Sequence, residues 1–406
     1  MSTWRLEDAE AHLLSLELFG MRFGLERMRR LLTVLGTPQE RFRAIHVVGT
    51  NGKSSTVRMI AALLEAHGVR TGSFLSPHLI TFAERIRVGD ADLDPDAFAA
   101  AVQRTAAAAA KVDRTLEEGD RVTQFELLTA AGFSELARQG VEVAVVEAGL
   151  GGRHDATNVL GAPVVVLTNV GLEHTRWLGP TVIDIAHEKL AVVRAGATLV
   201  TGPLDPELEP LAAATGARVI AAPPLEEGPA GYQHGNFGVA VAAARAHLGA
   251  LEPARVTEVA NRVQVPGRMQ VVEEQPLTIY DGAHNPSGMA ALRAALGDAV
   301  GGRPVVAVVS ILDDKDAAGM LRELVGKTVG AVFTSTRNPR ALPPATLASL
   351  AEQLGGPPSE IVPDPHAAVA RAQAIAGPEG AVLATGSIYL VADLLGEPGR
   401  RRASAL

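Results

Sequence analysis

Short runs of valine and isoleucine alternate with longer segments rich in alanine and leucine along most of this 406-residue chain. Continuous β-branched runs indicate strands that are buried on both faces, as in a parallel sheet covered by helices. We predict such strands at residues 44–48, 143–147, 163–168, 197–201 and 217–221. The alternation therefore predicts an α/β fold with a parallel sheet.

A second series of strand-like runs occupies the C-terminal third. It begins at "LTIYDGAHNP" and continues through "RPVVAVVSIL", "GAVFTST" and "GAVLATGSIYLV". Between the two series, residues 263–276 contain a Pro-Gly pair, which favours a turn. The chain is also longer than one core usually organises. We therefore predict two domains, residues 1–265 and a smaller one at residues 266–406, and we expect the alanine-rich run 99–112 to form a surface helix.

Composition excludes several classes of site and partner. The chain has no cysteine, which rules out disulfides, thiolate metal sites and a cysteine nucleophile, and which fits a reducing cytoplasm. Its formal net charge of −8 argues against a nucleic-acid-binding surface. The acidic N-terminus does not resemble a signal peptide, and no apolar run is long enough to span a membrane. We expect a cytoplasmic protein that binds neither nucleic acid nor membrane.

The stretch "HVVGTNGKSSTV", residues 46–57, is a candidate phosphate-binding loop. A glycine-rich turn between a strand and a helix directs backbone N–H groups and the positive end of the helix dipole at one point. The full pattern G-x-x-x-x-G-K-[ST] is not met, because Val47 stands at its first glycine. The alternative is an ordinary strand-to-helix turn with an exposed lysine. The candidate nucleotide-binding residues are Gly49, Thr50, Asn51, Gly52, Lys53, Ser54 and Ser55.

Two further stretches place polar residues after candidate strands, where open α/β sheets bind ligands. In "VAVVEAGLGGRHDATN" the strand ends at Glu147, and in "VVVLTNVGLEHTRWLG" the next strand is followed by Glu173 and His174. Magnesium that bridges ATP phosphates is normally held by carboxylates and water. Glu147 is therefore a magnesium-ligand candidate. His174 is a less usual ligand, and a structural histidine is its alternative.

Ten sequence blocks together resemble one family. They are "GTNGKSS", "LSPHL", "ERIRV", "EAGLGGRHDATN", "LEHTRWLG", "HEKLAVV", "VPGRMQ", "YDGAHNPSG", "LDDKD" and "TGSIYL". In this order they resemble the folylpolyglutamate synthase and dihydrofolate synthase family of the Mur ligase superfamily, from about residue 20 to 395, and most closely its bacterial bifunctional members. The resemblance implies an N-terminal P-loop domain of the Mur ligase central type, a smaller Rossmann-like C-terminal domain, and an active site in the cleft between them.

The implied activity is an ATP-dependent, amide-forming ligase. A substrate carboxylate of dihydropteroate or a folate takes the γ-phosphate of ATP, and the amine of L-glutamate then displaces phosphate from the acyl phosphate. Such chemistry depends on alignment and charge neutralisation more than on a protein nucleophile. The resemblance implies two Mg²⁺ ions, with a monovalent cation as a further candidate, and we expect a monomer.

The resemblance also assigns the metal site. Lys53 would contact the outer phosphates, Ser76 and Glu147 would hold the first magnesium, and His174 would hold the second. Lys189, in "HEKLAVV", matches a lysine that the family often carbamylates, which would let it support the second ion. From the residues alone, Ser76 would be a turn residue before Pro77 and Lys189 a lysine on a helix surface.

For the nucleotide and the pterin, the resemblance implies two more groups. Gln233 and Asn236 match a Q-x-x-N that contacts adenine, and Arg268, Asp281 and His284 match residues that reach the phosphates and ribose. The positions lining the pteroate pocket are Arg85, Phe125 and Asp155. An aromatic ring at Phe125 could stack on a flat pterin, although ordinary core packing is the alternative.

Three positions depart from the family pattern: Ser54 replaces a usual glycine, Gln124 a frequent tyrosine and Tyr232 a frequent histidine. Gln124 puts the shape of the pterin pocket in doubt. Alternatives to the bifunctional activity are folylpolyglutamate synthesis alone, a peptidoglycan Mur ligase, and a P-loop nucleotide switch. A peptidoglycan ligase would need a further N-terminal domain, but only about 45 residues precede the loop strand. A guanine-specifying N-K-x-D, expected of a switch, is absent.

Overall fold

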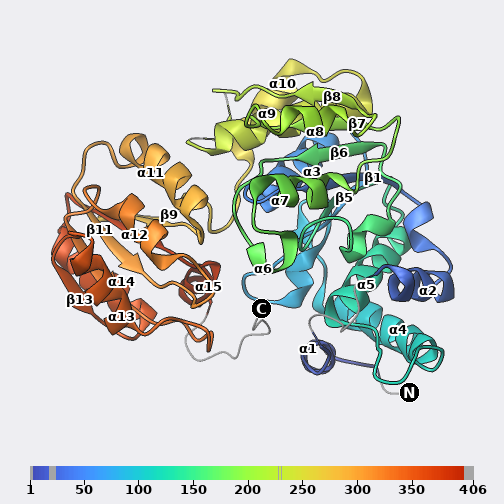
Figure 1. The fold of residues 1–406 in the computed structure, drawn as a ribbon, viewed down its shortest axis with the longest axis horizontal. Coiled ribbons are helices and arrows are strands. Elements are labelled where there is room, and N and C mark those ends of the chain that lie inside the picture. The colour runs from blue at the N-terminus through green and yellow to red at the C-terminus, as the bar shows by residue number, and fades with distance from the viewer. Residues whose placement is uncertain (1–2, 18–23, 227, 230, 397–406) are drawn as a thin grey trace. The chain divides into compact units, whose positions relative to one another are not determined.

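The structure is a computed structural model that describes residues 3–17, 24–226, 228–229 and 231–396. The chain divides into two compact units (Figure 1). Among the described residues, the first unit comprises 3–17, 24–226, 228–229 and 233–263, and the second comprises 231–232 and 264–396. None of the helices within the described residues has the length and apolar character needed to cross a membrane.

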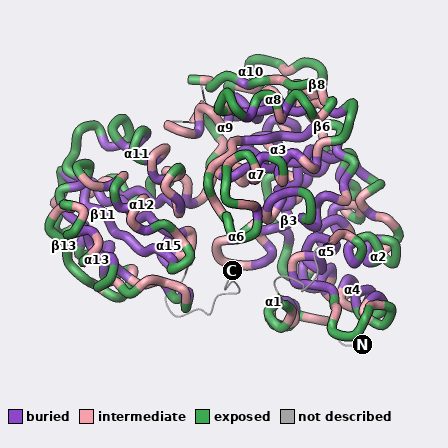
Figure 2. Tube along the Cα trace, viewed as in Figure 1, coloured by how far each residue is buried: buried purple, intermediate pink, exposed green. Residues whose placement is uncertain are grey.

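The first unit is built on an eight-stranded sheet with the order β4-β3-β2-β5-β1-β6-β7-β8. Its strands are β1 (Arg43–Val48), β2 (Thr71–Phe74), β3 (Ile86–Val88), β4 (Ala91–Asp92), β5 (Val143–Glu147), β6 (Val164–Leu167), β7 (Thr198–Thr201) and β8 (Arg218–Ala221). From β2 to β8 in this order neighbouring strands are parallel, whereas β3 and β4 form an antiparallel edge. The predicted parallel sheet is confirmed, and Figure 2 shows its central strands as buried.

Helices surround this sheet, some packed directly on it and others on neighbouring helices. They are α1 (Leu6–Leu14), α2 (Glu26–Val34), α3 (Lys53–Ala66), α4 (Pro95–Asp113), α5 (Gln124–Arg138), α6 (Thr175–Leu178), α7 (Val182–Leu190), α8 (Glu209–Ala213), α9 (Gln233–Leu248) and α10 (Pro253–Arg262), with short 3-10 turns η1 (Pro38–Glu40), η2 (Phe82–Arg85) and η3 (Ala156–Val159). Helix α3 packs on β1, β2, β5 and α9, and α5 packs on β2 and β3. The alanine-rich run is indeed helical, within α4, where the Asp94 carboxylate caps the first turn and Phe98 and Val102 are buried.

The second unit holds a six-stranded sheet with the order β13-β12-β11-β14-β10-β9. Its elements are β9 (Gln270–Glu274), β10 (Leu277–Tyr280), α11 (Pro286–Val300), β11 (Val305–Val309), α12 (Ala317–Leu324), β12 (Gly330–Phe333), α13 (Pro344–Gln353), β13 (Ser359–Ile361), α14 (Pro365–Ala376), β14 (Ala381–Thr385) and α15 (Ile388–Leu395). Among these strands of the described residues, β9 alone pairs antiparallel, and one isolated antiparallel bridge joins Leu312 to Ala341. Leu292 of α11 and Met320 of α12 pack with Val309 and Leu383 of the sheet in one apolar core.

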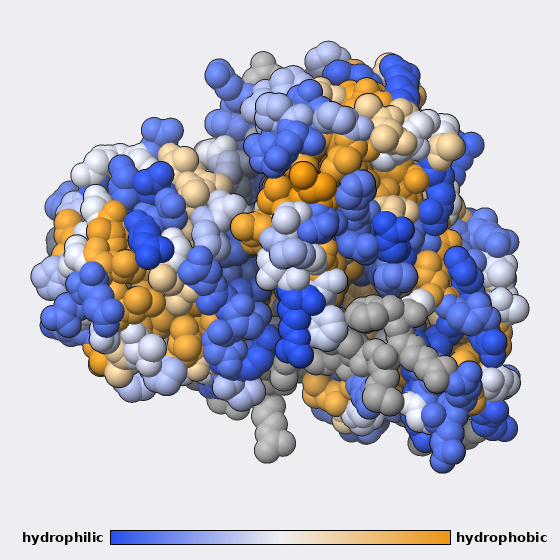
Figure 3. Space-filling model, viewed as in Figure 1, coloured by the Kyte–Doolittle hydropathy of each residue, from blue (hydrophilic) through white to orange (hydrophobic). Residues whose placement is uncertain are grey.

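Apolar side chains also reach the surface of the first unit. Leu172, Trp177 and Ile183 are among the exposed large hydrophobic residues, and they lie in or beside α6 and α7. Figure 3 shows apolar surface in the region of α7, next to hydrophilic residues. Single exposed apolar residues are ordinary on protein surfaces.

Candidate active site

The glycine-rich loop leads from β1 into α3, as predicted. Gly49 has a φ of 151° and Gly52 a φ of 80°, conformations that favour glycine. A Cβ at Gly49 would come within 1.9 Å of Thr168 Oγ1, and one at Gly52 within 2.3 Å of Asn236 Oδ1. The first N–H groups of an α-helix have no partner within the helix, so α3 directs donors and its positive dipole end toward the loop.

The segment after β6 holds this loop in place. The N–H groups of Thr50 and Asn51 donate to the backbone and side-chain oxygens of Asn169, at 3.0 and 2.9 Å. The Thr168 hydroxyl donates to Asn51 O at 2.7 Å. The ammonium of Lys53 lies over the loop and donates to Thr50 O at 3.1 Å. The loop shape is therefore fixed by the neighbouring parallel strand, and the helix start remains the part that faces outward.

Glu147 brings two residues of the predicted metal site, itself and Ser76, together with Ser54 of the nucleotide loop. It ends β5, the neighbour of β1, and only 1% of its surface is exposed. One carboxylate oxygen accepts from Ser54 Oγ at 3.0 Å, and the other accepts from the backbone N–H of Ser76 at 3.1 Å. A carboxylate beside the Ser54 hydroxyl offers hard oxygen donors of the kind that magnesium prefers, and Ser76 adjoins the same carboxylate through its backbone, so these residues fit the ion.

Lys189 is buried, with 4% of its surface exposed, which excludes the reading as a surface lysine. Its Nζ donates to the carbonyl oxygen of Gly49 at 2.7 Å, which links α7 to the nucleotide loop. Burial lowers the pKa of Lys189 to about 7, and the positive charge of Lys53 acts in the same direction. The carboxylates of Glu173 and Asp155 oppose this shift. An ammonium cannot ligate magnesium, so this residue fits the ion only in a modified, anionic form.

His174 lies at the start of α6 with a left-handed φ of 52°. Its side chain is 39% exposed, and its Nε2 is 3.9 Å from the carboxylate of Glu173, which is itself 8% exposed. Within the described ranges, no three His, Asp or Glu side chains are grouped as a metal site would require. Glu173, to which the sequence assigned no role, is the buried carboxylate of this segment; its position directly before His174 was the available signal.

The Q-x-x-N of α9 lies against the nucleotide loop. Gln233 is buried, and its Nε2 donates a long hydrogen bond of 3.4 Å to Ser55 Oγ. Asn236 Nδ2 donates to Gln233 Oε1 at 2.8 Å, and Asn236 Oδ1 is the atom that a Cβ at Gly52 would meet. The structure therefore brings both predicted adenine contacts to the start of α3.

Two of the three predicted pterin-pocket residues meet the loop after β5. The ring of Phe125 packs directly against Gly149, so closely that a Cβ at Gly149 would come within 2.5 Å of it. The Asp155 carboxylate accepts from Leu150 N at 2.8 Å and from Thr157 N at 3.0 Å. Phe125 is half-buried and packs tilted against Phe74, with ring centroids 6.2 Å apart. Asp155 thus shapes the loop on which Phe125 rests.

Arg85, the third residue, is buried elsewhere in η2. Its Nε donates to His78 Nδ1 at 2.9 Å, and its guanidinium lies over the Phe82 ring at 5.3 Å from the centroid. Gln124, at one of the positions that differ from the family pattern, is also buried. Its side chain donates to Leu13 O at 2.8 Å. Gln124 therefore ties α5 to α1 in the position where the family often has a tyrosine.

A buried chain of two hydrogen bonds, which the sequence did not suggest, connects His46 of β1 with Asp155. His46 Nε2 lies 2.8 Å from Thr157 Oγ1, and the Thr157 hydroxyl donates to Asp155 Oδ1. Because a hydroxyl has one proton to donate, His46 supplies the N–H in the first bond. Burial, with a smaller contribution from the charge of Arg194, lowers the pKa of His46 to about 3, so this histidine is neutral. Burial raises the pKa of Asp155, against the hydrogen bonds it accepts.

In the second unit, Asp281 organises the remaining predicted residues. It follows β10, is 1% exposed, and accepts from Tyr232 Oη, Met269 N and Ala283 N. Tyr232, a departure from the family pattern, is thus a partner of a predicted site residue. Burial raises the pKa of Tyr232 well above its usual value.

Arg268 and His284 flank Gly282 in the same unit. Arg268 Nη1 donates to Gly267 O at 3.0 Å, and a Cβ at Gly282 would approach that nitrogen to 2.2 Å. His284 Nδ1 lies 2.8 Å from Gly282 O. The predicted set Arg268, Asp281 and His284 therefore gathers around one glycine turn.

Two domain families match the chain. The Mur ligase middle domain matches residues 47–200, and the glutamate ligase domain of Mur ligases matches residues 267–388. The dihydrofolate synthase/folylpolyglutamate synthase of Bacillus subtilis is 31% identical over 93% of this chain and 95% of the relative. A probable bifunctional folylpolyglutamate synthase/dihydropteroate synthase of Haloferax volcanii is 32% identical over 95% of this chain, which spans only 50% of that relative.

Solved structures agree in fold over nearly the whole chain. Mycobacterium tuberculosis folylpolyglutamate synthase complexed with ADP superposes with a TM-score of 0.90 at 30% identity, covering 98% of this chain and 99% of that one. Escherichia coli FolC in complex with DHPP and ADP gives a TM-score of 0.86 at 28% identity, covering 97% of each chain. A bifunctional folylpolyglutamate synthase/dihydrofolate synthase with Mn, AMPPNP and L-glutamate bound gives 0.85 at 28% identity, covering 97% of this chain and 99% of that one. The chain belongs to the dihydrofolate synthase/folylpolyglutamate synthase family of Mur ligases.

Proposed function

We propose that this chain uses ATP to join L-glutamate to dihydropteroate, to folates, or to both, through an acyl phosphate. The observation that carries the proposal is the cluster at the carboxyl ends of β1 and β5, where Glu147 receives hydrogen bonds from Ser54 of the nucleotide loop and from Ser76. Phosphoryl transfer requires a phosphate cradle and hard oxygen ligands side by side, and this cluster supplies both.

In this proposal, the start of α3 and Lys53 bind the outer phosphates of ATP. Gln233 and Asn236, which match the Q-x-x-N of the family, bind the adenine end, and their contacts with Ser55 and Gly52 place them beside the nucleotide loop. Glu147 and Ser76 hold a first magnesium ion, which neutralises phosphate charge when bound. Ser54 is added to this set, because its hydroxyl shares the Glu147 carboxylate.

We further propose that Lys189 acts as a carbamate. A neutral amine adds to carbon dioxide to form a carbamate and release one proton, and a lowered pKa increases the neutral fraction at neutral pH. The modified side chain would be an anion beside Lys53 and would support the second magnesium together with His174. Its N–H could still donate to the Gly49 carbonyl.

For the pterin substrate, we propose that Phe125 stacks on the ring and that Asp155 holds the adjoining loop in shape. Arg85 belongs to this pocket in the family pattern, and its buried contacts with His78 and Phe82 support a role in fixing the pocket wall.

The second unit would complete nucleotide binding through Arg268, Asp281 and His284. We place the domain boundary between residues 265 and 266, and we propose a cytoplasmic monomer that binds no nucleic acid.

A substrate comparison tests the function. Purified protein with MgATP and L-glutamate should form ADP with dihydropteroate, with tetrahydrofolate, or with both, and should not form it when either glutamate or the pterin is omitted. Turnover with tetrahydrofolate alone would assign folylpolyglutamate synthesis only. ATP hydrolysis that is unaffected by pterin and glutamate would contradict the ligase and favour a nucleotide switch.

A further inference from the structure

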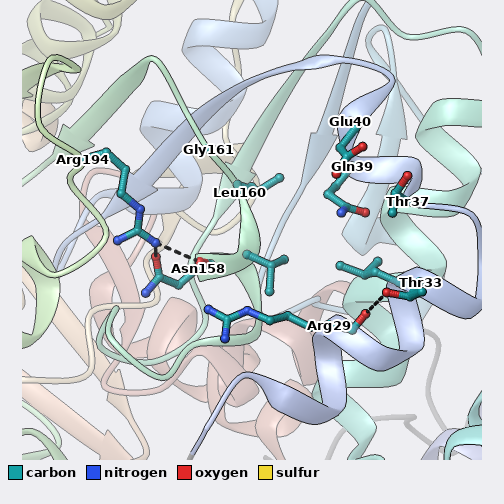
Figure 4. Close-up of a pocket in the computed structure, with 11 residues that line it drawn as sticks. Arg29, Thr33, Thr37, Gln39, Glu40, Asn158, Leu160, Gly161 and Arg194 are labelled. Atoms are coloured by element: carbon teal, nitrogen blue, oxygen red, sulfur yellow. Dashed lines mark hydrogen bonds between the residues drawn. The ribbon is translucent and has the colours of Figure 1, made fainter.

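A polar pocket of about 290 Å³ lies in the first unit, away from the nucleotide loop (Figure 4). Its lining includes Gln39 and Glu40, which precede β1, Leu160, which precedes β6, and Arg194, which precedes β7. These strands are parallel neighbours, so the pocket lies at their amino-terminal edge. The nucleotide loop follows the opposite end of β1, and a strand of this length spans about 20 Å.

The pocket carries two exposed guanidinium groups, and neither has a carboxylate partner among the residues that the structure describes. Of the three arginines close together on α2, Arg27 pairs with Glu126 and Asp120, and Arg30 pairs with Glu26. Arg29 lines the pocket, and in the described part of the chain no ion pair is recorded for it. Figure 4 shows its side chain extending from α2 toward Asn158.

Arg194 reaches Asn158 from the other side. Its Nη2 donates to Asn158 Oδ1 at 3.0 Å and to Asn158 O at 3.3 Å, which are neutral acceptors. No carboxylate is recorded as its partner among the residues described. Two positive groups therefore flank one buried asparagine, and the only acidic residue of the lining, Glu40, forms no recorded ion pair with either of them.

Gln39 gives independent support for a bound molecule. Its Oε1 atom is buried, and it has no hydrogen-bond partner among the residues that the structure describes. A buried acceptor without a donor costs about 1–3 kcal/mol, a cost that a donor on a bound molecule would remove. A protonated phosphate oxygen would supply this donor, whereas a carboxylate would not, because it only accepts hydrogen bonds.

We propose that this pocket binds a small oxyanion, a phosphate or carboxylate group, between Arg29 and Arg194. Guanidinium groups offer paired N–H donors that match either oxyanion, and Asn158 provides a further amide beside them. A bound oxyanion competes with Asn158 for the N–H groups of Arg194. Because Asn158 N donates to Asp155 O at 2.8 Å, the site borders the segment that carries the Asp155 carboxylate.

Calorimetric titration of the whole chain tests the site with two probes, inorganic phosphate and glutarate. A saturating non-hydrolysable ATP analogue with Mg²⁺ occupies the nucleotide loop, which would otherwise bind phosphate itself. The variants are Arg29→Gln and Arg194→Gln. The matched control is Arg30→Gln, which removes a neighbouring charge from the same helix but leaves the pocket lining intact.

We expect saturable binding of at least one probe. Arg29→Gln and Arg194→Gln should each weaken this binding about tenfold or more, which is the scale of losing one charge-assisted hydrogen bond. Arg30→Gln should change it less than about twofold. Loss for phosphate alone assigns phosphates as the ligand class, and loss for glutarate alone assigns carboxylates. Arg29→Lys should bind more tightly than Arg29→Gln, and thermal melts identify any variant that fails to fold. The proposal would be overturned if neither probe bound saturably, or if all three glutamine variants lost affinity equally.

Discussion

The hydroxyl of Ser54 donates a 3.0 Å hydrogen bond to the buried carboxylate of Glu147, which joins the nucleotide loop to the end of the neighbouring strand. Two segments 93 residues apart in sequence thereby form one site.

Lys53→Ala should lower kcat by two to three orders of magnitude, about 3–4 kcal/mol, because it removes a positive charge directed at the transferred phosphoryl group. Steady-state turnover with saturating MgATP measures the loss. The exposed Lys111 of α4 offers a control, since Lys111→Ala should leave the rate unchanged. Near-normal turnover of Lys53→Ala would contradict the phosphate-binding role of the loop.

Glu147→Gln should raise the Mg²⁺ concentration needed for half-maximal activity sharply, because the amide retains the shape of the side chain but loses its charge. The amide oxygen can accept from the Ser76 N–H while the amide NH2 donates to Ser54 Oγ, so both contacts can persist and we expect the loop to keep its fold. A magnesium titration of activity, with a thermal melt beside it, measures both effects. An unchanged titration would eliminate Glu147 as a ligand.

Lys189→Ala and Lys189→Arg should both be inactive if Lys189 functions as a carbamate, since arginine keeps the positive charge but is not expected to carry the modification. Short carboxylates added to Lys189→Ala should restore part of the rate by occupying the vacated space. Labelled bicarbonate should give the wild type a carbamate carbon signal in NMR spectra that is missing from both variants. A Lys189→Arg variant with substantial activity would indicate a simple cationic role.

The pKa of His46 predicts how stability depends on pH. Its folded value of about 3 lies below the ordinary histidine value of 6.5, so the unfolded chain binds the extra proton between these two pH values. The free energy of unfolding should therefore fall as the pH drops from 6.5 toward 3, and this one residue contributes up to about 1.4 kcal/mol per pH unit.

His46→Gln should flatten this dependence, because glutamine can donate to Thr157 without titrating. Urea unfolding at several pH values measures the slope. The exposed His187 of α7 provides the control, and His187→Gln should keep the wild-type slope. Equal slopes in the wild type and His46→Gln would show that folding does not lower the pKa of His46.

The sequence alone predicted the strands with continuous valine and isoleucine runs, such as 143–147, because burial on both faces leaves a clear pattern. It missed β4, which has two exposed residues, and β9, whose residues are mostly exposed, since edge strands need no apolar run. It also missed β2, a short strand containing Gly72. The space that a side chain at Gly72 would occupy is filled by Leu136 of α5.

For the site, sequence reasoning found the groups next to strand ends but not the contacts between distant segments. Nothing local to "HEKLAVV" indicates that Lys189 is buried, since its carbonyl partner Gly49 lies 140 positions earlier. The hydrogen bond between His46 and Thr157 spans 111 positions and was equally invisible. Such contacts arise only when the sheet order places β1 beside both β5 and β6.

The hydrogen bonds of Asp155 limit how the proposed pterin pocket can be redesigned. Replacing Asp155 alone would leave the N–H groups of Leu150 and Thr157 without their acceptor, at about 1–3 kcal/mol for each buried donor. A design that admits a larger ring must therefore exchange residues 149–157 together. Position 46 must change with them, because His46 contacts the hydroxyl of Thr157.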